Sequence, residues 1–540
     1  MIFGGFTEMN PARIEVDKIY RAMSEMLGRN FPIACYADEF YYFPQVQAVE
    51  RPWRVWDLFF PDVVSDCCRN LSFWIDDLQR IDAGEDHHLE IEIMTLLKIA
   101  STLREQLGDI ELWRYQPTFI LTLVCLGLAE ALDSSVPEAA NERAASLPEY
   151  IDSTCRNFST VPVLFRDLGL EMVTDTIRYL TSLGEILPEV SRSLPALERF
   201  AHALRTVQTC ESFVLPTEFV KRIYRYHINC QADTDEIGQE LDEEIDNMRR
   251  MMNKEADRLL KHRAMVNRDD SLWKEAVRSV ACPVVGNGGM TALYREEIDR
   301  LAQHCLDNGF VSAEMIDSCP VLLAPVPDHL SAIRTASSYS IPPGHPPKGG
   351  TFYLLNEETS GKQAQREYRM LCAHETYPGH HLLDSSRWNY LSPLIRVVEQ
   401  PLFYEGWACF AENLMKVTGY FSDPASRLLL ARRRFWRALR GKIDLRLHTG
   451  RIGLQKAAAV LTSSGMDKKR AFSIVRKYVL NPGYQVCYTI GLKRFMQLFD
   501  RFGQNNPSLF VKTALRYGEI GFGDLTSVFM RQNIEENFEK

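Results

Sequence analysis

The sequence predicts a mainly α-helical protein of two lobes with one small β-sheet. Apolar residues recur three and four positions apart over most of the chain, which is typical of amphipathic helices. Short β-prone runs punctuated by Pro and Gly gather between about residues 281 and 356. The 540 residues, 46% hydrophobic and 25% charged, are enough for more than one globular core.

The N-terminal lobe, residues 1–270, is expected to be helical throughout. Its clearest helical periods lie at residues 63–81, 89–107, 119–132 and 172–187. The third segment is the longest apolar run, but it is too short to span a bilayer and contains Glu130, so it predicts a buried helix. Residues 232–262 place acidic residues before basic ones and predict a long helix, either an exposed hairpin arm or a packed element.

The C-terminal lobe, residues 271–540, is expected to begin with a sheet of about three strands at about 281–356. Helical periods then return, for example in 401–417 ahead of Gly419, a glycine typical of helix ends. Basic residues recur between 427 and 451 among apolar ones at helical spacing. We interpret them as a solvated helix face, with the binding of acidic groups, including a substrate carboxylate, as the alternative.

The amino-acid composition limits the kinds of partner that the protein can bind and the compartment in which we expect it. Lys plus Arg number 62 and Asp plus Glu 71, a net charge of −9 that argues against a nucleic-acid binder. We expect no membrane partner, since no apolar run is long enough and the N-terminus lacks a signal-peptide pattern. Thirteen scattered cysteines without CxxC spacing favour a cytoplasmic location. The sequence does not indicate the oligomeric state.

Three of the twelve histidines and a glutamate crowd into "HETYPGHH", residues 374–381. A hydrolytic zinc site uses three protein ligands, often two histidines one helical turn apart with a glutamate as general base between them. Here Pro378 stands where the second histidine would be. In an unbroken helix His380 would point about 120° away from His374, and His381 would lie about 10 Å farther along.

A break at Pro378 and Gly379 would make this spacing usable. Proline interrupts the helical hydrogen bonds and glycine permits backbone conformations closed to other residues, so the chain can turn His380 back toward His374. The segment "FYEGWACFAENLM" offers Glu405 as third ligand, with Gly406 leaving room for a metal. Glu412, seven residues on, lies on the same face and is a candidate for orienting a histidine N–H.

Other potential ligands fit less well. Glu85 and His88 form an ExxH pattern, but a di-iron bundle needs a second one, so a surface turn is preferred. Cys372 and Cys409 flank the candidate site, yet thiolates would be unusual beside a complete hydrolytic ligand set.

Four motifs in order, "HETYPGHH", "YEGWACFAENLM", "IDLRLHTG" and "NPGYQVCYTIG", closely resemble the bacterial family called domain of unknown function 885 (DUF885). The resemblance is clearest over residues 280–540. That family is similar to the largely helical, zincin-like zinc peptidases of the thermostable carboxypeptidase, thimet oligopeptidase and angiotensin-converting enzyme type. Dipeptidyl peptidase III is a similar case with a lengthened His-Glu motif.

The resemblance implies one Zn²⁺ per chain, bound by His374, His380 and Glu405, with Glu375 as general base. His381 remains an alternative second ligand or a supporting residue. The family often continues with Leu-Gln after the double histidine, whereas this chain has Leu382, Leu383 and Asp384.

Late residues complete the implied site. His448 and Tyr488 are the candidates for stabilising an oxyanion, with Tyr484 as a weaker one. Arg476 is a candidate for binding a substrate carboxylate.

The expected function is therefore a zinc metallopeptidase, possibly carboxypeptidase-like, that hydrolyses peptides or another small amide. An edge strand at 349–355 or 335–341 would pair with the extended substrate. The alternatives are a metal-dependent amide hydrolase or biosynthetic enzyme acting on a non-peptide, and a non-catalytic binding protein with a peptidase shell. Glu375 speaks against the last of these, because a structural metal site needs no base.

Overall fold

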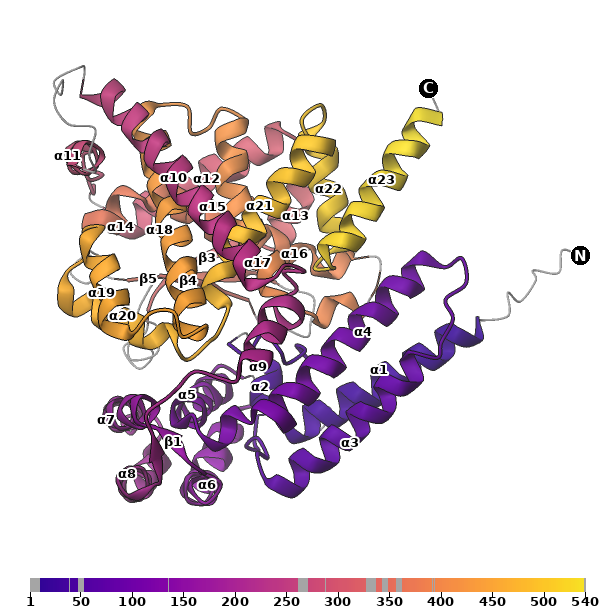
Figure 1. The fold of residues 1–540 in the computed structure, drawn as a ribbon, viewed down its shortest axis with the longest axis vertical. Helices are drawn as coiled ribbons and strands as arrows, with labels where there is room; N and C mark the ends of the chain where they lie inside the picture. The colour runs from indigo at the N-terminus through magenta and orange to yellow at the C-terminus, as the bar shows by residue number, and fades with distance from the viewer. Residues whose placement is uncertain are drawn as a thin grey trace, which may run out of the picture. The chain divides into compact units, whose positions relative to one another are not determined.

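The chain is mainly α-helical, as predicted, and forms two compact units (Figure 1). The structure is a computed structural model that describes residues 10–37, 39–46, 53–134, 136–260, 271–286, 288–326, 337–341, 348–355, 362–390, 392 and 394–538. Unit 1 comprises Met1–Ser212 and Ser392–Glu399, and unit 2 comprises Phe213–Leu391 and Gln400–Lys540. The lobe boundary expected after residue 270 falls at 261–270, outside the described residues, and stays a prediction.

Unit 1 is built of helices, most of which begin with proline at a first position where its missing N–H costs no hydrogen bond. They are α1 Pro11–Asn30, α2 Pro32–Tyr36, α3 Pro61–Leu78, α4 His87–Glu105, α5 Pro117–Asp133, α6 Pro137–Cys155, α7 Val163–Leu183 and α8 Leu194–Thr206. The four predicted helical segments correspond to α3, α4, α5 and α7. The short strands β1 Val161–Pro162 and β2 Thr209–Cys210 pair in parallel.

The apolar helix α5 is a core element, as predicted, with Leu121, Leu123, Val124 and Leu128 fully buried. In the part of the chain that the structure describes, no single helix has the length and hydropathy to cross a membrane. The helical stretches His87–Arg114 and Pro117–Asp133, bent by 96°, satisfy those criteria only as a pair.

Unit 2 contains the longest helices and all predicted site residues. Its helices are α9 Thr217–Arg222, α10 Thr234–Leu259, α11 Ser271–Ser279, α12 Gly289–Asp307, α13 Ala313–Ser318, α14 Lys362–Arg366, α15 Tyr368–Glu375, α16 His380–Ser386, α17 Pro401–Val417, α18 Pro424–His448, α19 Leu454–Ser463, α20 Lys468–Tyr478, α21 Tyr484–Phe502, α22 Pro507–Tyr517 and α23 Phe522–Phe538. Helix α10 is a packed element and not an exposed hairpin arm, since Ile237, Leu241 and Met252 on its inner face are fully buried.

Helices α17 and α21 cross at a pair of glycines. A Cβ atom added at Gly406 would lie 2.6 Å from the Cα of Gly491, which is far too close for any side chain. The expectation that Gly406 leaves room for a metal is therefore wrong. Its function is to let α21 approach the helix that carries Glu405.

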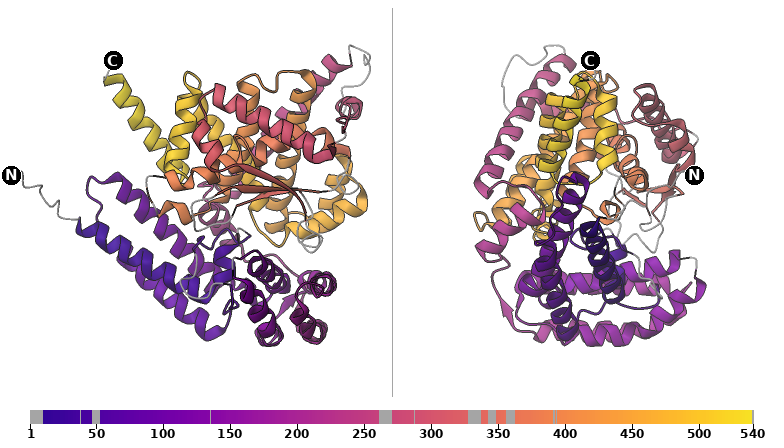
Figure 2. Two further views of the ribbon diagram at one scale, coloured as in Figure 1. Left: turned by 180° about the vertical axis from the view of Figure 1, so that it is seen from behind. Right: turned by 90° about the vertical axis from the view of Figure 1, so that its right-hand side faces the viewer.

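The predicted small sheet has three strands in the order β3 Val321–Pro325, β5 Gly350–Leu354, β4 Ser338–Ser340 (Figure 2). Strand β3 pairs with β5 in parallel and β4 pairs with β5 antiparallel. Of the two expected edge strands, 349–355 is therefore wrong because β5 is paired on both sides. The other, 335–341, contains the edge strand β4, with 335 and 336 outside the described residues.

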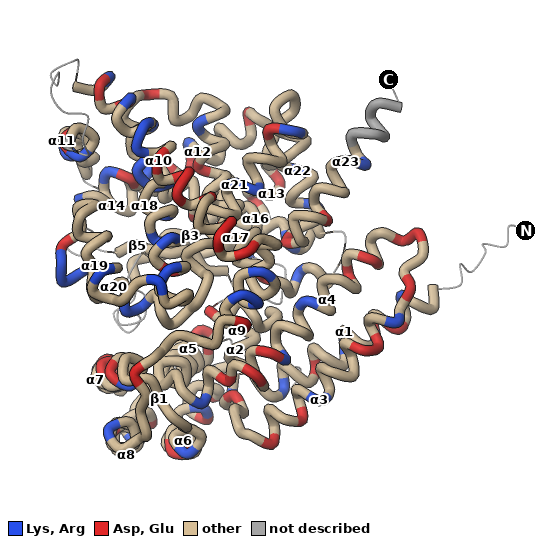
Figure 3. Tube along the Cα trace, viewed as in Figure 1, with Lys and Arg blue, Asp and Glu red and all other residues tan. Residues whose placement is uncertain are grey.

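Basic residues recur along α18 (Figure 3), but they do not form a simple solvated face. Arg434 and Arg437 are buried and form ion pairs with Glu244 and Glu412 at 2.8 and 2.6 Å. The partners of these two arginines are carboxylates of the chain itself, and the alternative interpretation, binding of acidic groups such as a substrate carboxylate, stays a prediction. Because apolar side chains cover most of the circumference of α18, the helix lacks a fully solvated side for them to occupy.

Candidate metal centre

The break that the sequence predicted separates α15 from α16. Helix α15 ends at Glu375 and α16 begins at His380, so that the two histidines sit at facing helix ends. Gly379 has a φ of −78°, which is not in the left-handed region. Glycine is required there because the backbone of α15 leaves no space for a side chain. A Cβ atom at this position would lie 1.8 Å from the carbonyl oxygen of His374. The indole N–H of Trp407 on α17 donates to the carbonyl of Pro378 at 2.9 Å and fastens the connection.

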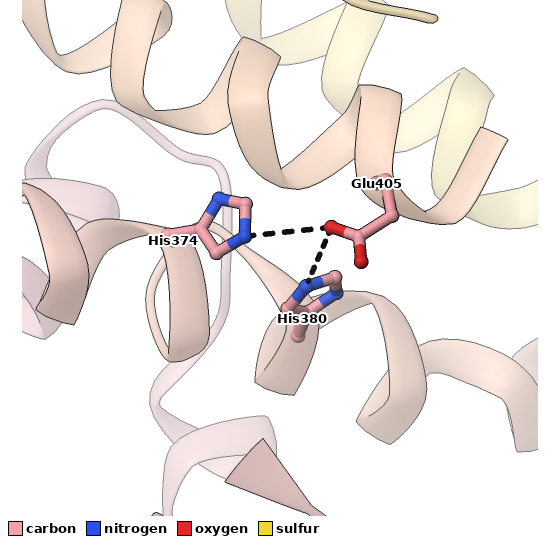
Figure 4. Close-up of side chains that lie close together, drawn as sticks. All are labelled: His374, His380 and Glu405. Carbon is pink, nitrogen blue, oxygen red and sulfur yellow. Dashed lines mark ion pairs between the residues drawn. The ribbon is translucent and has the colours of Figure 1, made fainter. Parts of the chain in front are cut away.

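Three buried side chains converge at this break (Figure 4). The Nε2 atoms of His374 and His380 lie 3.5 and 3.6 Å from the same carboxylate oxygen, Oε2 of Glu405. One potential ligand atom from each residue falls within 4.8 Å of the other two. The structure thus brings together the three predicted ligands in a group that could hold a metal ion.

The chemistry of this group fits a cation. Oε2 of Glu405 is buried and has no hydrogen-bond donor among the described residues, although it faces two ring nitrogens. A buried carboxylate oxygen without a partner is costly, and a metal ion would satisfy it. Two imidazole nitrogens and one carboxylate oxygen form a ligand set that suits Zn²⁺ and leaves a fourth position open.

The protonation state of Glu405 also fits a metal ligand. Burial by itself would raise the pKa of Glu405, but the two neighbouring imidazoles outweigh burial and hold that pKa well below its usual range. The carboxylate is therefore ionised, as a metal ligand must be. The Tyr484 hydroxyl donates to its other oxygen, Oε1, at 2.7 Å and fixes its orientation.

His374 is oriented by the residue expected to do so. Its Nδ1 lies 3.1 Å from Oε1 of Glu412, which is fully buried. Arg433 and Arg437 donate to the same carboxylate at 2.9 and 2.6 Å. A histidine that donates Nδ1–H to a carboxylate presents Nε2 to the metal in the correct tautomer.

His380 is held differently, by ring stacking. Its ring lies 4.1 Å from that of Tyr404 at an interplanar angle of 23°. The Tyr404 hydroxyl donates to Asp384 at 2.9 Å, and Nε of Arg387 donates to the same carboxylate at 2.8 Å. Asp384 thus fixes the ring that positions His380.

His381 is not part of the group formed by His374, His380 and Glu405, and it forms hydrogen bonds with residues in and next to the sheet. Its Nδ1 accepts from the Tyr339 hydroxyl at 3.0 Å, and its Nε2 donates to the carbonyl of Cys319 at 2.9 Å. Burial lowers its pKa to about 4, so the ring is neutral. Because both nitrogens are already hydrogen-bonded, the geometry favours His380 over His381 as the second histidine of the group.

Glu375 links the group to the sheet. Its half-buried carboxylate accepts the backbone N–H of Tyr339, on the edge strand β4, at 3.2 Å. Tyr339 itself has room because β5 begins with Gly350, where a Cβ atom would lie 2.1 Å from the Tyr339 hydroxyl oxygen.

Tyr488, on α21, lies near the group. Its ring is 4.8 Å from the guanidinium of Arg440 and 5.8 Å from that of Arg437. Burial first, and then the Glu405 carboxylate, raise its pKa well above the usual value, so the phenol remains a hydrogen-bond donor.

Of the remaining predicted residues, His448 is held by contacts within the core. Nε2 of His448 lies 3.2 Å from the carbonyl of Tyr478 and 3.4 Å from Asp444, inside the core. Burial lowers the pKa of His448 to about 4. Arg476 is half-buried on α20. The catalytic and substrate-binding functions suggested for these two residues stay predictions.

Sequence reasoning did not identify Tyr339, Tyr404, Arg433 and Arg437 as members of the site. The two arginines could have been predicted from the sequence. They belong to a run of arginines among many apolar residues, and arginines that become buried in such a helix need carboxylate partners. For the tyrosines there was no such signal, since tyrosine is common in cores and their partners lie in other elements.

Comparison with known proteins agrees with the motifs. A family model described as "bacterial protein of unknown function (DUF885)" matches residues 134–527. No curated protein matches the chain significantly.

Solved structures share the fold. A "putative lipoprotein of unknown function" from Shewanella oneidensis matches with a TM-score of 0.74 at 14% identity, over 95% of this chain and 99% of that one. A "putative lipoprotein" from Colwellia psychrerythraea matches with the same score and identity, over 97% and 99%. A Pyrococcus furiosus carboxypeptidase matches at a TM-score of only 0.42 and 10% identity, over 97% and 99%, which supports no inference about function.

The cytoplasmic location expected from the cysteines is contradicted by the descriptions of the two lipoproteins. The cysteines are a weak indicator for a physical reason. All thirteen are free and most are buried, and burial raises the pKa of Cys409, for example, to about 12. Such thiols are protonated and shielded from oxidants, so they report packing and not the redox compartment.

Proposed function

The chain belongs to the family of bacterial proteins of unknown function DUF885, and from its candidate metal centre we propose that it is a zinc-dependent metallopeptidase. The observation that carries this proposal is the convergence of His374, His380 and Glu405 on one buried point, where a carboxylate oxygen lacks a donor among the residues that the structure describes. We further propose a carboxypeptidase-like action on a peptide or small amide.

Zinc bound by these three side chains supplies Lewis acidity, which lowers the pKa of water and polarises a carbonyl group. Glu375 takes the proton from the attacking water and passes it to the leaving amine. The Tyr339 N–H supports this base function because it holds the Glu375 carboxylate in one orientation.

The remaining functions fall to residues around the group. Tyr488 is protonated and donates a hydrogen bond to the oxyanion that develops on the substrate. Tyr484 orients Glu405, and Glu412 orients His374. The short edge strand β4 supports the proposal of a peptide substrate, since an extended backbone can pair beside it.

Metal analysis of four variants beside the wild type tests the proposal. We expect one zinc per chain in the wild type and in Glu375→Gln, and none in His374→Ala or His380→Ala. His304→Ala is the matched control in the same unit, because His304 is hydrogen-bonded to Thr418 and belongs to another cluster. It should retain full zinc.

Hydrolysis of a peptide library, followed by mass spectrometry, tests the reaction. Glu375→Gln should lower kcat by roughly 100-fold or more, because general base catalysis contributes about that much. Turnover equal to wild type would refute Glu375 as the base. Zinc-loaded wild type that cleaves no peptide would refute the peptidase and leave a non-peptide amide as the substrate class.

A further inference from the structure

A second candidate site lies in unit 2 among α10, α17, α18 and α21. A cavity of about 1100 Å³ opens between the C-terminal parts of α10, α17 and α21 and the N-terminal part of α18. Its lining includes seven basic side chains but only three acidic ones, and none of the three candidate metal ligands. The volume is that of a site for a small organic molecule.

Two of the three acidic residues are already neutralised by lining arginines. Glu244 pairs with Arg434 at 2.8 Å. Glu255 pairs with both Arg427 and Arg258, at 3.1 and 2.7 Å. These pairs build the walls of the cavity and leave Asp500, which accepts from the Gln504 amide at 3.1 Å, as the one lining carboxylate without a basic partner among the described residues.

Lys254, Lys416 and Arg250 have no acidic partner among the residues that the structure describes. Arg250 instead donates to the side-chain amide of Asn247. Lys416 is half-buried, and its pKa is lowered by burial and by the neighbouring Arg434 and Arg427, which together outweigh the opposite effect of the Glu255 carboxylate. A partly buried ammonium group surrounded by other cations is unfavourable unless an anion joins it.

The helix termini do not account for this excess. Lys416 lies in the last turn of α17 and Arg258 in the last turn of α10, where the helix dipole favours cations. Each helix end offers about half a negative charge, so two ends balance about one cation. Three basic side chains without a carboxylate partner exceed that amount; Arg250 and Lys254 are exposed to water, and Lys416 is the half-buried one.

The cavity also presents apolar surface. Three methionines, Met248, Met251 and Met496, line it together with Phe499 and Val417. Val417 is 54% exposed and adds apolar surface that water can reach. Methionine adapts its shape to varied apolar ligands.

We propose that this cavity binds an anionic amphiphile, with a carboxylate or phosphate head at Lys416 and Lys254 and an apolar chain against the methionines. The two cations supply charge-assisted hydrogen bonds to the head, and the apolar lining removes the chain from water. This function is separate from hydrolysis at the metal centre.

Isothermal titration of the full-length, zinc-loaded protein tests the proposal. The ligands are octanoate, octyl phosphate and uncharged 1-octanol, all below their aggregation concentrations. At least one anion should bind, and octanol should bind about tenfold more weakly or worse, since a charged hydrogen bond contributes about that factor. The preferred anion identifies the head group.

Variants place the ligand in the cavity. Lys416→Gln and Lys254→Gln should each weaken binding of the preferred anion about tenfold. Lys254 is exposed, so its variant should fold even if the half-buried Lys416 proves necessary for stability. Lys456→Gln, at an exposed position on α19, is the matched control and should bind as the wild type does.

Four results would overturn the proposal. They are no binding of either anion, equal binding of octanol, unchanged affinity in Lys254→Gln and in a folded Lys416→Gln, and loss of binding when zinc is removed with a chelator. The last result would place the anion at the metal group instead. Binding that survives chelation and falls only in the cavity variants would establish the site.

Discussion

At the scale of single residues, the two histidines of the metal group are held by different forces. His374 is fixed by a hydrogen bond to a buried carboxylate that two arginines neutralise, whereas His380 is fixed by stacking on Tyr404. A charged hydrogen bond sets direction and tautomer together, but stacking sets only the ring plane. His374 should therefore depend more on the charge of its partner than His380 does.

Replacement of Glu412 by glutamine tests this dependence. The amide oxygen can still accept from Nδ1 of His374, but it carries no charge, so Arg437 loses its counterion and Arg433 keeps only Glu367, at 3.7 Å. We expect zinc affinity to fall by about 10- to 100-fold, the range typical of such supporting residues. Competition with a chromophoric chelator measures the change.

Glu244→Gln is the matched control, since Glu244 is also buried and paired with an arginine of α18. It should destabilise the protein to a similar degree and leave zinc affinity unchanged. Equal zinc affinities in the two variants would contradict the function assigned to Glu412.

Sequence reasoning could nominate His374, Glu375, His380 and Glu405 because histidine is scarce in this chain and few residue types bind metals. It could not assign Gly406, since whether a glycine makes room for an ion or for another helix depends on a crossing with Gly491, 85 residues away. Contacts of this kind are tertiary and leave no local pattern.

At the scale of elements, the site depends on one interruption and one helix crossing. The break between α15 and α16 brings two histidines six positions apart to the same point. The close approach of α17 and α21 brings Tyr484 within 2.7 Å of Glu405. Both arrangements rely on glycines that tolerate no added carbon.

Gly379→Ala should disrupt the break. The new Cβ atom would overlap the carbonyl oxygen of His374, and its obstacle is backbone, which cannot simply swing aside. We expect a destabilisation of about 1–3 kcal/mol or more, as for overpacked cores, together with loss of stoichiometric zinc. Thermal unfolding and metal analysis measure the two effects.

Gly453→Ala is the control for this change. Gly453 has a φ of −91° and open space around its Cβ position, so alanine should cost little there. Full zinc content in Gly379→Ala would show that the break does not need glycine.

The long elements were predictable because their periods are local. The segments 63–81 and 401–417 carry repeated apolar spacing and clear end signals, and they form α3 and α17. The order of the sheet was not predictable, because the same three strand segments permit several pairings. The side chain that favours the observed one, Tyr339 over Gly350, acts only after folding.

At the scale of the whole molecule, the two units differ in their buried charges. Unit 2 holds the metal group, the arginine-rich α18 and the proposed anion cavity. Unit 1 holds Asp57, a fully buried carboxylate that accepts the backbone N–H groups of Ile33 and Ala34 at the start of α2. Because Asp57 and the candidate metal ligands lie in separate units, zinc should not change the titration of Asp57.

Asp57 gives unit 1 a defined pH dependence. Burial raises its pKa to about 7, although the two N–H donors and Arg143 oppose that shift. In the unfolded chain the pKa is about 3.9, so the folded state binds the proton more tightly. The contribution of Asp57 to stability is therefore largest below about pH 4 and is lost as pH rises toward 7, by at most about 1.4 kcal/mol per pH unit.

Hydrogen exchange at the Ile33 and Ala34 amides, corrected for intrinsic rates, measures this loss. The wild type should lose protection between pH 4 and 7 relative to Asp57→Asn, because asparagine does not titrate and its own cost is independent of pH. The difference between the two proteins should be the same with zinc and with a chelator, since the candidate ligands lie in unit 2. A difference that stays constant over this pH range would refute the assignment to Asp57, and one that changes with zinc would show that the units are energetically coupled.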